Sequence, residues 1–206
     1  MNSYSILKVC GMRDPSNIRA VEALGIDWMG FIFWPGSTRY VNTVPAYLPL
    51  RARRVGVFVD ATLDDILQHV RDYALHLVQL HGHESPDFCR ALRAACGDSI
   101  ALIKAFSVAT EQDLEASKEY EPLVDYFLFD TRSTLPGGSG QQFDWSILDA
   151  YNGSVPFLLS GGIGPEDASR IRSFRHPRCI GFDLNSRFES APALKDISLL
   201  SRIICH

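Results

Sequence analysis

The sequence lacks the features of secreted, membrane-spanning and nucleic-acid-binding proteins. No apolar stretch in its 206 residues approaches the roughly 20 needed to cross a bilayer. Its start, Met1-Asn2-Ser3-Tyr4, has no charged segment followed by an apolar one, so we expect no signal peptide and a cytoplasmic protein. The formal charge is −4, and the Lys and Arg residues are scattered. This distribution provides no basic surface for a phosphate backbone and argues against nucleic acid as a partner.

Metal-binding and redox motifs are also missing. The five cysteines are irregularly spaced and contain no C-x-x-C pair: Cys10, Cys89, Cys96, Cys179 and Cys205. This pattern argues against a zinc knuckle or a redox dithiol, and a reducing cytoplasm would keep all five as free thiols. His81 and His83 stand two residues apart, but no third ligand converges with them, so we predict no metal site.

Short apolar runs alternate with helical patterns along the chain. The runs are nearly continuous in Val, Ile, Leu and Phe, as in strands buried on both faces of a parallel sheet. The predicted strands are Ile6–Cys10, Trp28–Phe33, Arg54–Val59, Leu77–Leu80, Ala101–Ala105, Tyr126–Phe129, Phe157–Leu159 and Cys179–Phe182. The predicted helices are Pro15–Leu24, Leu63–Tyr73, Pro86–Ala95, Glu111–Tyr120, Trp145–Tyr151, Pro165–Phe174 and Ala193–Ile204. No linker divides the chain, so we expect one domain over residues 1–206.

Eight β/α units predict a small α/β protein with a (β/α)8 TIM-barrel fold. The second unit is the weakest, because Asn42–Pro49 contains two prolines and can hold only a short helix. An open doubly wound sheet is the competing fold, and it usually carries a G-x-G-x-x-G turn after its first strand. Here that turn reads Gly11-Met12-Arg13-Asp14, which favours the barrel. In a barrel the chemistry lies on the loops that follow the strands.

Two of these strand ends carry candidate catalytic groups. Cys10 closes the first apolar run before Gly11. Free cysteine is usually a packing residue, but a thiolate at a strand end also acts as a base or nucleophile. Asp130 follows the apolar run Tyr126–Phe129. Partial desolvation there would raise its pKa and make it a general acid, whereas capping of the following loop is the alternative.

Other strand ends carry binding groups. Ser160-Gly161-Gly162 lets a ligand approach the backbone, and the helix near Pro165 would direct free N–H groups toward a phosphate. Asn185-Ser186 on the eighth loop would complete that site, because barrel phosphate sites commonly use loops seven and eight. Arg39 offers two donors to a carboxylate or phosphate; the alternative is a side chain that is solvated or paired with an acidic neighbour. The glycine-rich segment 137–140 is either a lid or a connection.

Taken in order, the strand ends resemble the phosphoribosylanthranilate isomerase family over the whole chain. The motifs that carry the resemblance are Lys8-Val9-Cys10-Gly11, Gly30-Phe31-Ile32-Phe33, Ser37-Thr38-Arg39-Tyr40-Val41, Val55-Gly56-Val57-Phe58-Val59, Val78-Gln79-Leu80-His81-Gly82, Phe129-Asp130-Thr131, Gly137-Gly138-Ser139-Gly140 with Gln141-Gln142-Phe143-Asp144-Trp145, Ser160-Gly161-Gly162 and Lys195-Asp196. The resemblance implies a cofactor-free barrel of tryptophan biosynthesis. Its substrate is a small phosphosugar, N-(5-phosphoribosyl)anthranilate, which undergoes an Amadori rearrangement to the 1-amino-1-deoxyketose phosphate.

The resemblance also implies residue roles. Asp130 would protonate the furanose ring oxygen, Cys10 would remove the proton from C2, and Arg39 would bind the anthranilate carboxylate. The remaining substrate-binding residues would be His81, Gly161, Gly162, Asp183, Asn185 and Ser186. Two positions depart from the family pattern: Arg187 stands where the eighth loop commonly has glycine, and Ser160 where alanine is usual.

Three other functions compete with this assignment. A ribulose-phosphate epimerase needs metal ligands that the sequence does not assemble. The histidine-pathway aminoaldose isomerase relies on two aspartates, and Cys10 stands where the first is expected. A non-catalytic regulatory barrel would have lost Cys10 or Asp130. The sequence leaves open whether the protein is a monomer or a homodimer and whether the histidine-pathway substrate is also accepted.

Overall fold

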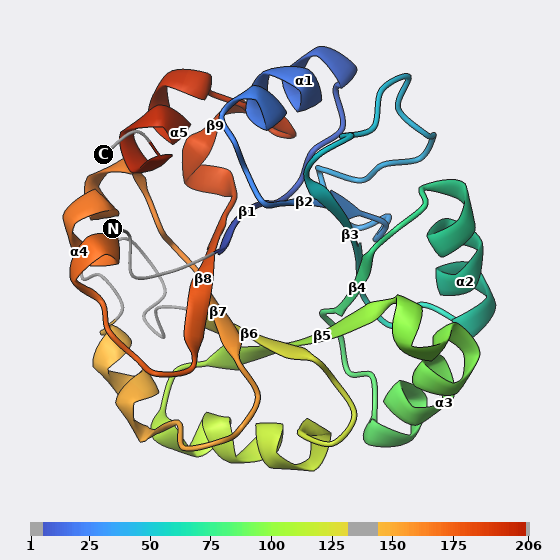
Figure 1. Ribbon diagram of the computed structural model, residues 1–206, viewed down its shortest axis with the longest axis vertical. Coiled ribbons are helices and arrows are strands. Elements are labelled where there is room, and N and C mark those ends of the chain that lie inside the picture. Colours follow the sequence, from blue (N-terminus) through green and yellow to red (C-terminus); the bar gives the residue numbers. More distant parts are fainter. Residues whose placement is uncertain (1–5, 132–143, 205–206) are drawn as a thin grey trace.

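A computed structural model describes residues 6–131 and 144–204, and its centre is a closed ring of eight parallel strands (Figure 1). The strands, in chain order, are β1 (Ile6–Val9), β2 (Trp28–Ile32), β3 (Arg53–Phe58), β4 (Leu77–Leu80), β5 (Ala101–Val108), β6 (Tyr126–Thr131), β7 (Phe157–Ser160) and β8 (Cys179–Leu184). The ring closes because β1 pairs with both β2 and β8. The predicted (β/α)8 barrel is confirmed, and the open doubly wound sheet is wrong. The glycine-rich segment 137–140 lies outside the described residues.

Helices surround this ring on its outer side (Figure 1). They are α1 (Pro15–Ala23), α2 (Leu63–Asp72), α3 (Pro86–Cys96), the short helices η2 (Glu111–Tyr120), η3 (Trp145–Ala150) and η4 (Pro165–Asp167), and then α4 (Ala168–Ser173) and α5 (Ile197–Ile204). The first three begin at side-chain caps. Asp14, Thr62 and Ser85 each accept a hydrogen bond from the backbone N–H three residues later.

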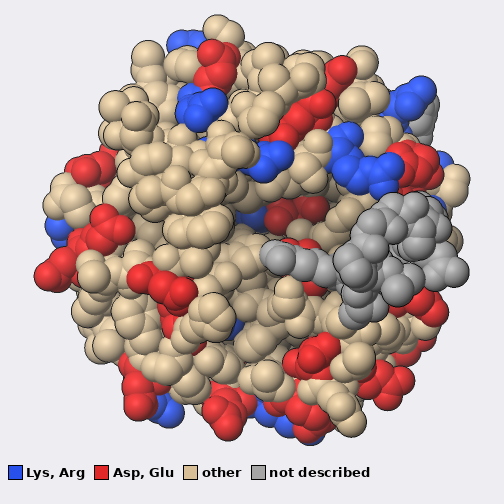
Figure 2. All heavy atoms as spheres, turned by 180° about the vertical axis from the view of Figure 1, so that it is seen from behind, with Lys and Arg blue, Asp and Glu red and all other residues tan. Residues whose placement is uncertain are grey.

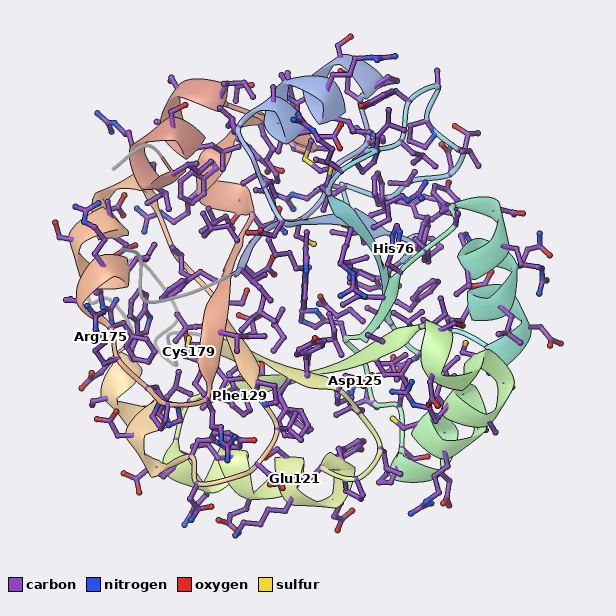
Figure 3. The ribbon with its side chains drawn as sticks, in the orientation of Figure 1. His76, Glu121, Asp125, Phe129, Arg175 and Cys179 are labelled. Atoms are coloured by element: carbon purple, nitrogen blue, oxygen red, sulfur yellow. The ribbon has the colours of Figure 1, made fainter. Side chains whose placement is uncertain are left out.

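Apolar side chains fill two layers, one inside the ring of strands and one between the strands and the helices (Figure 3). The inner layer includes Trp28, Val55, Leu77, Ile103, Leu128 and Leu158. Both faces of each strand are therefore buried, which explains the nearly continuous apolar runs in the sequence. Polar side chains interrupt the inner layer where the strands end, and these side chains form the site described below.

Two predicted helices, η2 and η3, have the expected positions but wind as 3₁₀ helices. In η2 the buried residues are Leu114 and Ser117, and in η3 they are Trp145 and Leu148. Each pair is three residues apart, so a helix with three residues per turn already buries both members. Neither segment presents the broader apolar stripe that favours an α-helix.

The second β/α unit contains no helix: Asn42–Pro49, which we expected to hold at most a short one, holds none. Pro45 and Pro49 donate no backbone hydrogen bond, and each disfavours helical geometry in the residue before it. The chain instead crosses from β2 to β3 as an irregular segment. Glu22 of α1 holds this segment by accepting hydrogen bonds from Tyr47 Oη (2.5 Å) and from the backbone N–H groups of Arg51 (2.6 Å) and Ala52 (3.1 Å).

The start of the last predicted helix is also wrong. Ala193–Lys195 belongs to a small hairpin in which β9 (Glu189–Ala191) pairs antiparallel with β10 (Leu194–Lys195). Ala193 has a φ of +65°, which does not fit a helix. The helix begins only after Asp196, whose side chain accepts hydrogen bonds from the N–H groups of Ser198 and Leu199.

The helices of this barrel are short. Among residues 6–131 and 144–204, none is both long enough and apolar enough to pass through a bilayer.

Candidate active site

A cavity of ≈ 190 Å³ lies at the end of the barrel where the strands finish. Figure 2 shows a hollow near the centre of one face, with acidic and basic side chains inside it. The cavity is lined by Cys10, Ile32, Val57, Gln79, His81, Asp130, Ser160, Gly161, Gly162, Ile163, Asp183, Asn185 and Ser186. Every predicted site residue except Arg39 is in this set. Asp130 and Asp183 belong to strands β6 and β8 and not, as predicted, to the segments after them.

Cys10 directly follows β1 and is 4 % exposed. Its backbone N–H donates to the carbonyl of Leu184 (2.9 Å), which fixes the end of β1 against β8. Gly30 on β2 makes room for the thiol, because a Cβ there would lie 2.7 Å from Cys10 Sγ. The motif Gly30-Phe31-Ile32-Phe33 therefore needs its glycine to accommodate the candidate base.

Lys8 lies two residues before Cys10, and its buried ammonium group is 2.9 Å from Asp183 Oδ1. Burial lowers the pKa of Lys8, but Asp183 and Cys10 outweigh this effect and the net shift is upward. Burial raises the pKa of Cys10 above its ordinary value of 9.0, while the charge of Lys8 works in the opposite direction. The free protein therefore holds Cys10 mainly as a thiol near neutral pH. Sequence reasoning missed Lys8, although alternation along a strand places residues 8 and 10 on one face.

Asp130 faces Cys10's cavity from β6, and its side chain is 15 % exposed. Its Oδ2 lies 3.6 Å from His81 Nε2, and His81 Nδ1 lies 2.8 Å from Gln79 Nε2. Gly161 passes close by, because a Cβ there would lie 2.7 Å from Asp130 Oδ1. Closure of the barrel thus brings the candidate acid and base to one cavity. The predicted rise in the pKa of Asp130 stays a prediction.

The two histidines have separate surroundings. His81 lines the cavity, whereas His83 is almost fully exposed and lies 3.1 Å from Asp60 Oδ2. In the described part of the chain, no three His, Cys, Asp or Glu side chains gather as metal ligands would.

The predicted phosphate-binding loops meet at the cavity. Gly161 and Gly162 have φ values of +98° and +63°, a region that favours glycine. The predicted supply of free N–H groups from the next helix is reduced, because Asp167 Oδ2 accepts a hydrogen bond from the Gly164 N–H (2.8 Å). Arg187 donates to the Gly162 carbonyl (3.2 Å) and pairs with Glu166, so it ties loops seven and eight together.

Arg39 lies outside the cavity lining and pairs with an acidic neighbour, one of the two alternatives in the sequence. Its Nη2 is 2.6 Å from Glu189 Oε2, and Lys195 Nζ is 2.6 Å from Glu189 Oε1. Lys195 also donates to Asn185 Oδ1 (2.8 Å), which connects this cluster to the cavity. One carboxylate therefore faces two cations, and the cluster keeps a net positive charge beside the site. Sequence reasoning missed Glu189 and the buried side chain of Lys195, because it predicted no hairpin here and assigned residues 193–195 to the last helix.

Comparison with known proteins agrees with this geometry. The family model for N-(5'-phosphoribosyl)anthranilate (PRA) isomerase matches residues 7–205. The N-(5'-phosphoribosyl)anthranilate isomerase of Phocaeicola vulgatus is 53% identical over 191 residues, which are 93% of this chain and 92% of that protein.

Two solved structures have the same fold. The phosphoribosyl anthranilate isomerase of Thermotoga maritima is 31% identical with a TM-score of 0.80, and the match covers 97% of each chain. A phosphoribosyl anthranilate isomerase solved in complex with reduced 1-(o-carboxyphenylamino)-1-deoxyribulose 5-phosphate is 30% identical, with a TM-score of 0.79 over 97% of this chain and 96% of that one. The chain belongs to the N-(5'-phosphoribosyl)anthranilate isomerase family.

Proposed function

We propose that this protein performs its family's reaction with Asp130 as acid and Cys10 as base. N-(5-phosphoribosyl)anthranilate is converted to 1-(2-carboxyphenylamino)-1-deoxyribulose 5-phosphate by an Amadori rearrangement, a step in tryptophan biosynthesis. The observation that supports these roles is the shared cavity, which is lined by both side chains and by the glycine loop after β7.

Ring opening needs an acid. Protonated Asp130 gives its proton to the furanose ring oxygen, the C1–O bond breaks, and the nitrogen lone pair forms an iminium at C1. His81 lies beside the carboxylate that this step leaves behind. Its N–H stabilises the new charge, and such positioned donors are among the larger contributions to catalysis.

Isomerisation needs a base. The thiolate of Cys10 removes the proton from C2, and the C–H electron pair forms the C1–C2 double bond of an enolamine while the iminium nitrogen is neutralised. The enolamine then tautomerises to the ketone. Substrate and product are isomers, so Cys10 must release the proton it took and Asp130 must regain one before the next turnover. The buried ammonium group of Lys8 favours the thiolate form of Cys10.

The rest of the site supports binding of the two anionic ends of the substrate. We assign the phosphate to the loops after β7 and β8, at Gly161, Gly162, Asn185 and Ser186. The positive cluster around Arg39 attracts the anthranilate carboxylate, although Arg39 has to share its donors with Glu189. The related isomerase solved with a reduced deoxyribulose 5-phosphate compound supports this class of ligand.

An assay without added metal or nucleotide tests the proposal. Purified protein, with a chelator present, should consume phosphoribosylanthranilate. Changing Cys10→Ser or Asp130→Asn should lower kcat by about a hundredfold or more, the usual contribution of a positioned acid or base. Near-normal turnover in either folded variant would remove that residue from the mechanism.

Growth provides a second test. The wild-type chain should rescue a tryptophan auxotroph that lacks this isomerase, and Cys10→Ala should not. Failure of the wild-type chain, when it is expressed and folded, would favour the non-catalytic barrel.

A further inference from the structure

Gln79 of β4 has no part in the mechanism described above, yet its side chain lines the cavity and the residue is only 1 % exposed. It stands two residues before His81, and alternation along the strand turns both side chains toward the inside of the barrel. A buried amide carries two donors and an acceptor, and each has to be satisfied within the site.

The amide nitrogen of Gln79 determines the protonation of His81. Gln79 Nε2 lies 2.8 Å from His81 Nδ1. An amide nitrogen can only donate, so Nδ1 must accept and carries no proton. The ring proton is then on Nε2, the nitrogen that faces Asp130 Oδ2 at 3.6 Å. Held in this way, His81 is neutral and presents an N–H to the candidate acid.

A neutral His81 matters for Asp130. A cation beside Asp130 would favour the carboxylate over the protonated form, which would weaken Asp130 as a proton donor. The buried lysines nearby are already paired, Lys104 with Glu84 (2.9 Å) and Lys8 with Asp183 (2.9 Å). Gln79 thus keeps an additional positive charge away from Asp130. The Nε2–H of His81 remains free to donate to the Asp130 carboxylate.

The carbonyl end of Gln79 points to a second role. Gln79 Oε1 is buried and accepts no hydrogen bond from any of the described residues. Leaving a buried acceptor unsatisfied is unfavourable, so such an atom usually has a partner in the functional state. Because the side chain lines the cavity, a hydroxyl group of a bound sugar can supply the missing donor.

We propose that Gln79 is a bifunctional residue of this site, which orients neutral His81 toward Asp130 and accepts a hydrogen bond from a sugar hydroxyl of the substrate. This assignment rests on the proposed function, since the sugar and the role of Asp130 come from it. Its two halves predict different kinetic effects, so substitutions can separate them.

Two substitutions and one spectrum test the assignment. Gln79→Met keeps the approximate size but removes both polar groups, so KM should rise and kcat should fall, each by about tenfold, the scale of one hydrogen bond. Gln79→Glu keeps an acceptor and loses the donors, so kcat should fall while KM stays near the wild-type value. ¹⁵N NMR of the wild-type protein should show His81 protonated at Nε2 only, and in Gln79→Glu Nδ1 should gain a proton.

His83→Gln is the matched control, because His83 is exposed and two residues away. It should keep wild-type kinetics, and the loss of its signals identifies those of His81. Wild-type constants in both folded Gln79 variants, or a proton on Nδ1 in the wild-type protein, would overturn the assignment. If KM rose and kcat fell by the same factors in Gln79→Met and Gln79→Glu, the proposed contact with the sugar hydroxyl would be wrong. Absence of isomerase activity in the wild-type chain would instead defeat the proposed function, while the spectrum would still decide the state of His81.

Discussion

Single residues control the chemistry of this site because the barrel buries their charged groups. Lys8 and Asp183 form a buried pair, and Cys10 lies beside them. Burial alone disfavours a thiolate, whereas a neighbouring ammonium group favours it. The balance found here leaves the pKa of Cys10 above its ordinary value, and this balance determines how the reaction depends on pH.

We expect kcat/KM to hold through pH 9 and to fall only above it. The reaction needs protonated Asp130 and the thiolate of Cys10 together, and a carboxyl group ordinarily titrates far below a thiol. As pH rises, the gain of thiolate offsets the loss of protonated carboxyl until Cys10 is ionised, and burial raises the pKa of that thiol above 9.0. Cys10→Asp replaces the thiol by a carboxyl group, whose ordinary pKa of about 3.9 is far lower. The falling limb should then move to lower pH. Circular dichroism at each pH checks that the protein stays folded.

The groups that face Cys10 are Lys8, Asp183, Lys195 and Arg39. All four remain in Cys10→Asp, so this variant isolates the base. A falling limb at the same pH in both proteins would assign the titration to another group.

Sequence reasoning found the residues whose types are unusual at strand ends and missed those hidden inside the strands. Cys10 and Asp130 were predicted because they end apolar runs. Lys8 and Gln79 lie within such runs, where an isolated polar residue gives no sign of its partner. Their roles depend on contacts with Asp183 and His81 that exist only in the closed barrel.

Among the helices and strands, short-range sequence signals predicted those whose ends depend on short-range interactions. Helices α2 and α3 begin at Leu63 and Pro86 as predicted, where the side chains of Thr62 and Ser85 cap them. The hairpin of β9 and β10 was missed, because its geometry depends on the buried ion pairs of Glu189 with Arg39 and Lys195. The same is true of the segment between β2 and β3, which is held by a side chain of α1.

The role of Glu22 in holding the segment between β2 and β3 can be tested by substitution. Glu22→Ala should lower the free energy of unfolding by about 3 kcal/mol, because it removes the charged acceptor of the Arg51 and Ala52 backbone N–H groups and leaves the buried N–H of Ala52 without a partner. Tyr47→Phe removes only the hydroxyl bond to Glu22 and should cost about 1 kcal/mol. Urea unfolding measures both. Equal losses in the two variants would mean that the carboxylate does not anchor the backbone.

The protein combines a dry core with titratable groups that hold their protons more tightly because they are buried. Cys89 is fully buried on α3, and burial raises the pKa of its thiol to about 11. Burial likewise raises the pKa of Cys179 to about 11 and that of Tyr151 to about 12. In the unfolded chain these groups return to their ordinary values of 9.0 and 10.0.

These shifts predict a loss of stability at alkaline pH. A raised pKa means that the folded state binds the proton more tightly, so the stabilising effect is complete below pH 9 and is lost as pH rises toward 11 for the thiols and 12 for Tyr151. For Cys89 the loss is on the order of 2 kcal/mol, since one unit of pKa corresponds to about 1.4 kcal/mol. Urea unfolding at several pH values from 8 to 11 measures the decline.

Two substitutions on α3 separate titration from packing. Cys89→Ala removes the thiol, so the protein should be less stable at pH 8 but should lose less stability between pH 9 and 11. Leu92→Ala lies on the same buried face and removes no titratable group, so it should lower stability by about 2–5 kcal/mol at every pH and keep the wild-type slope. If the wild-type and Cys89→Ala curves ran parallel, the alkaline loss would arise elsewhere, and Cys179 and Tyr151 would be the next groups to replace.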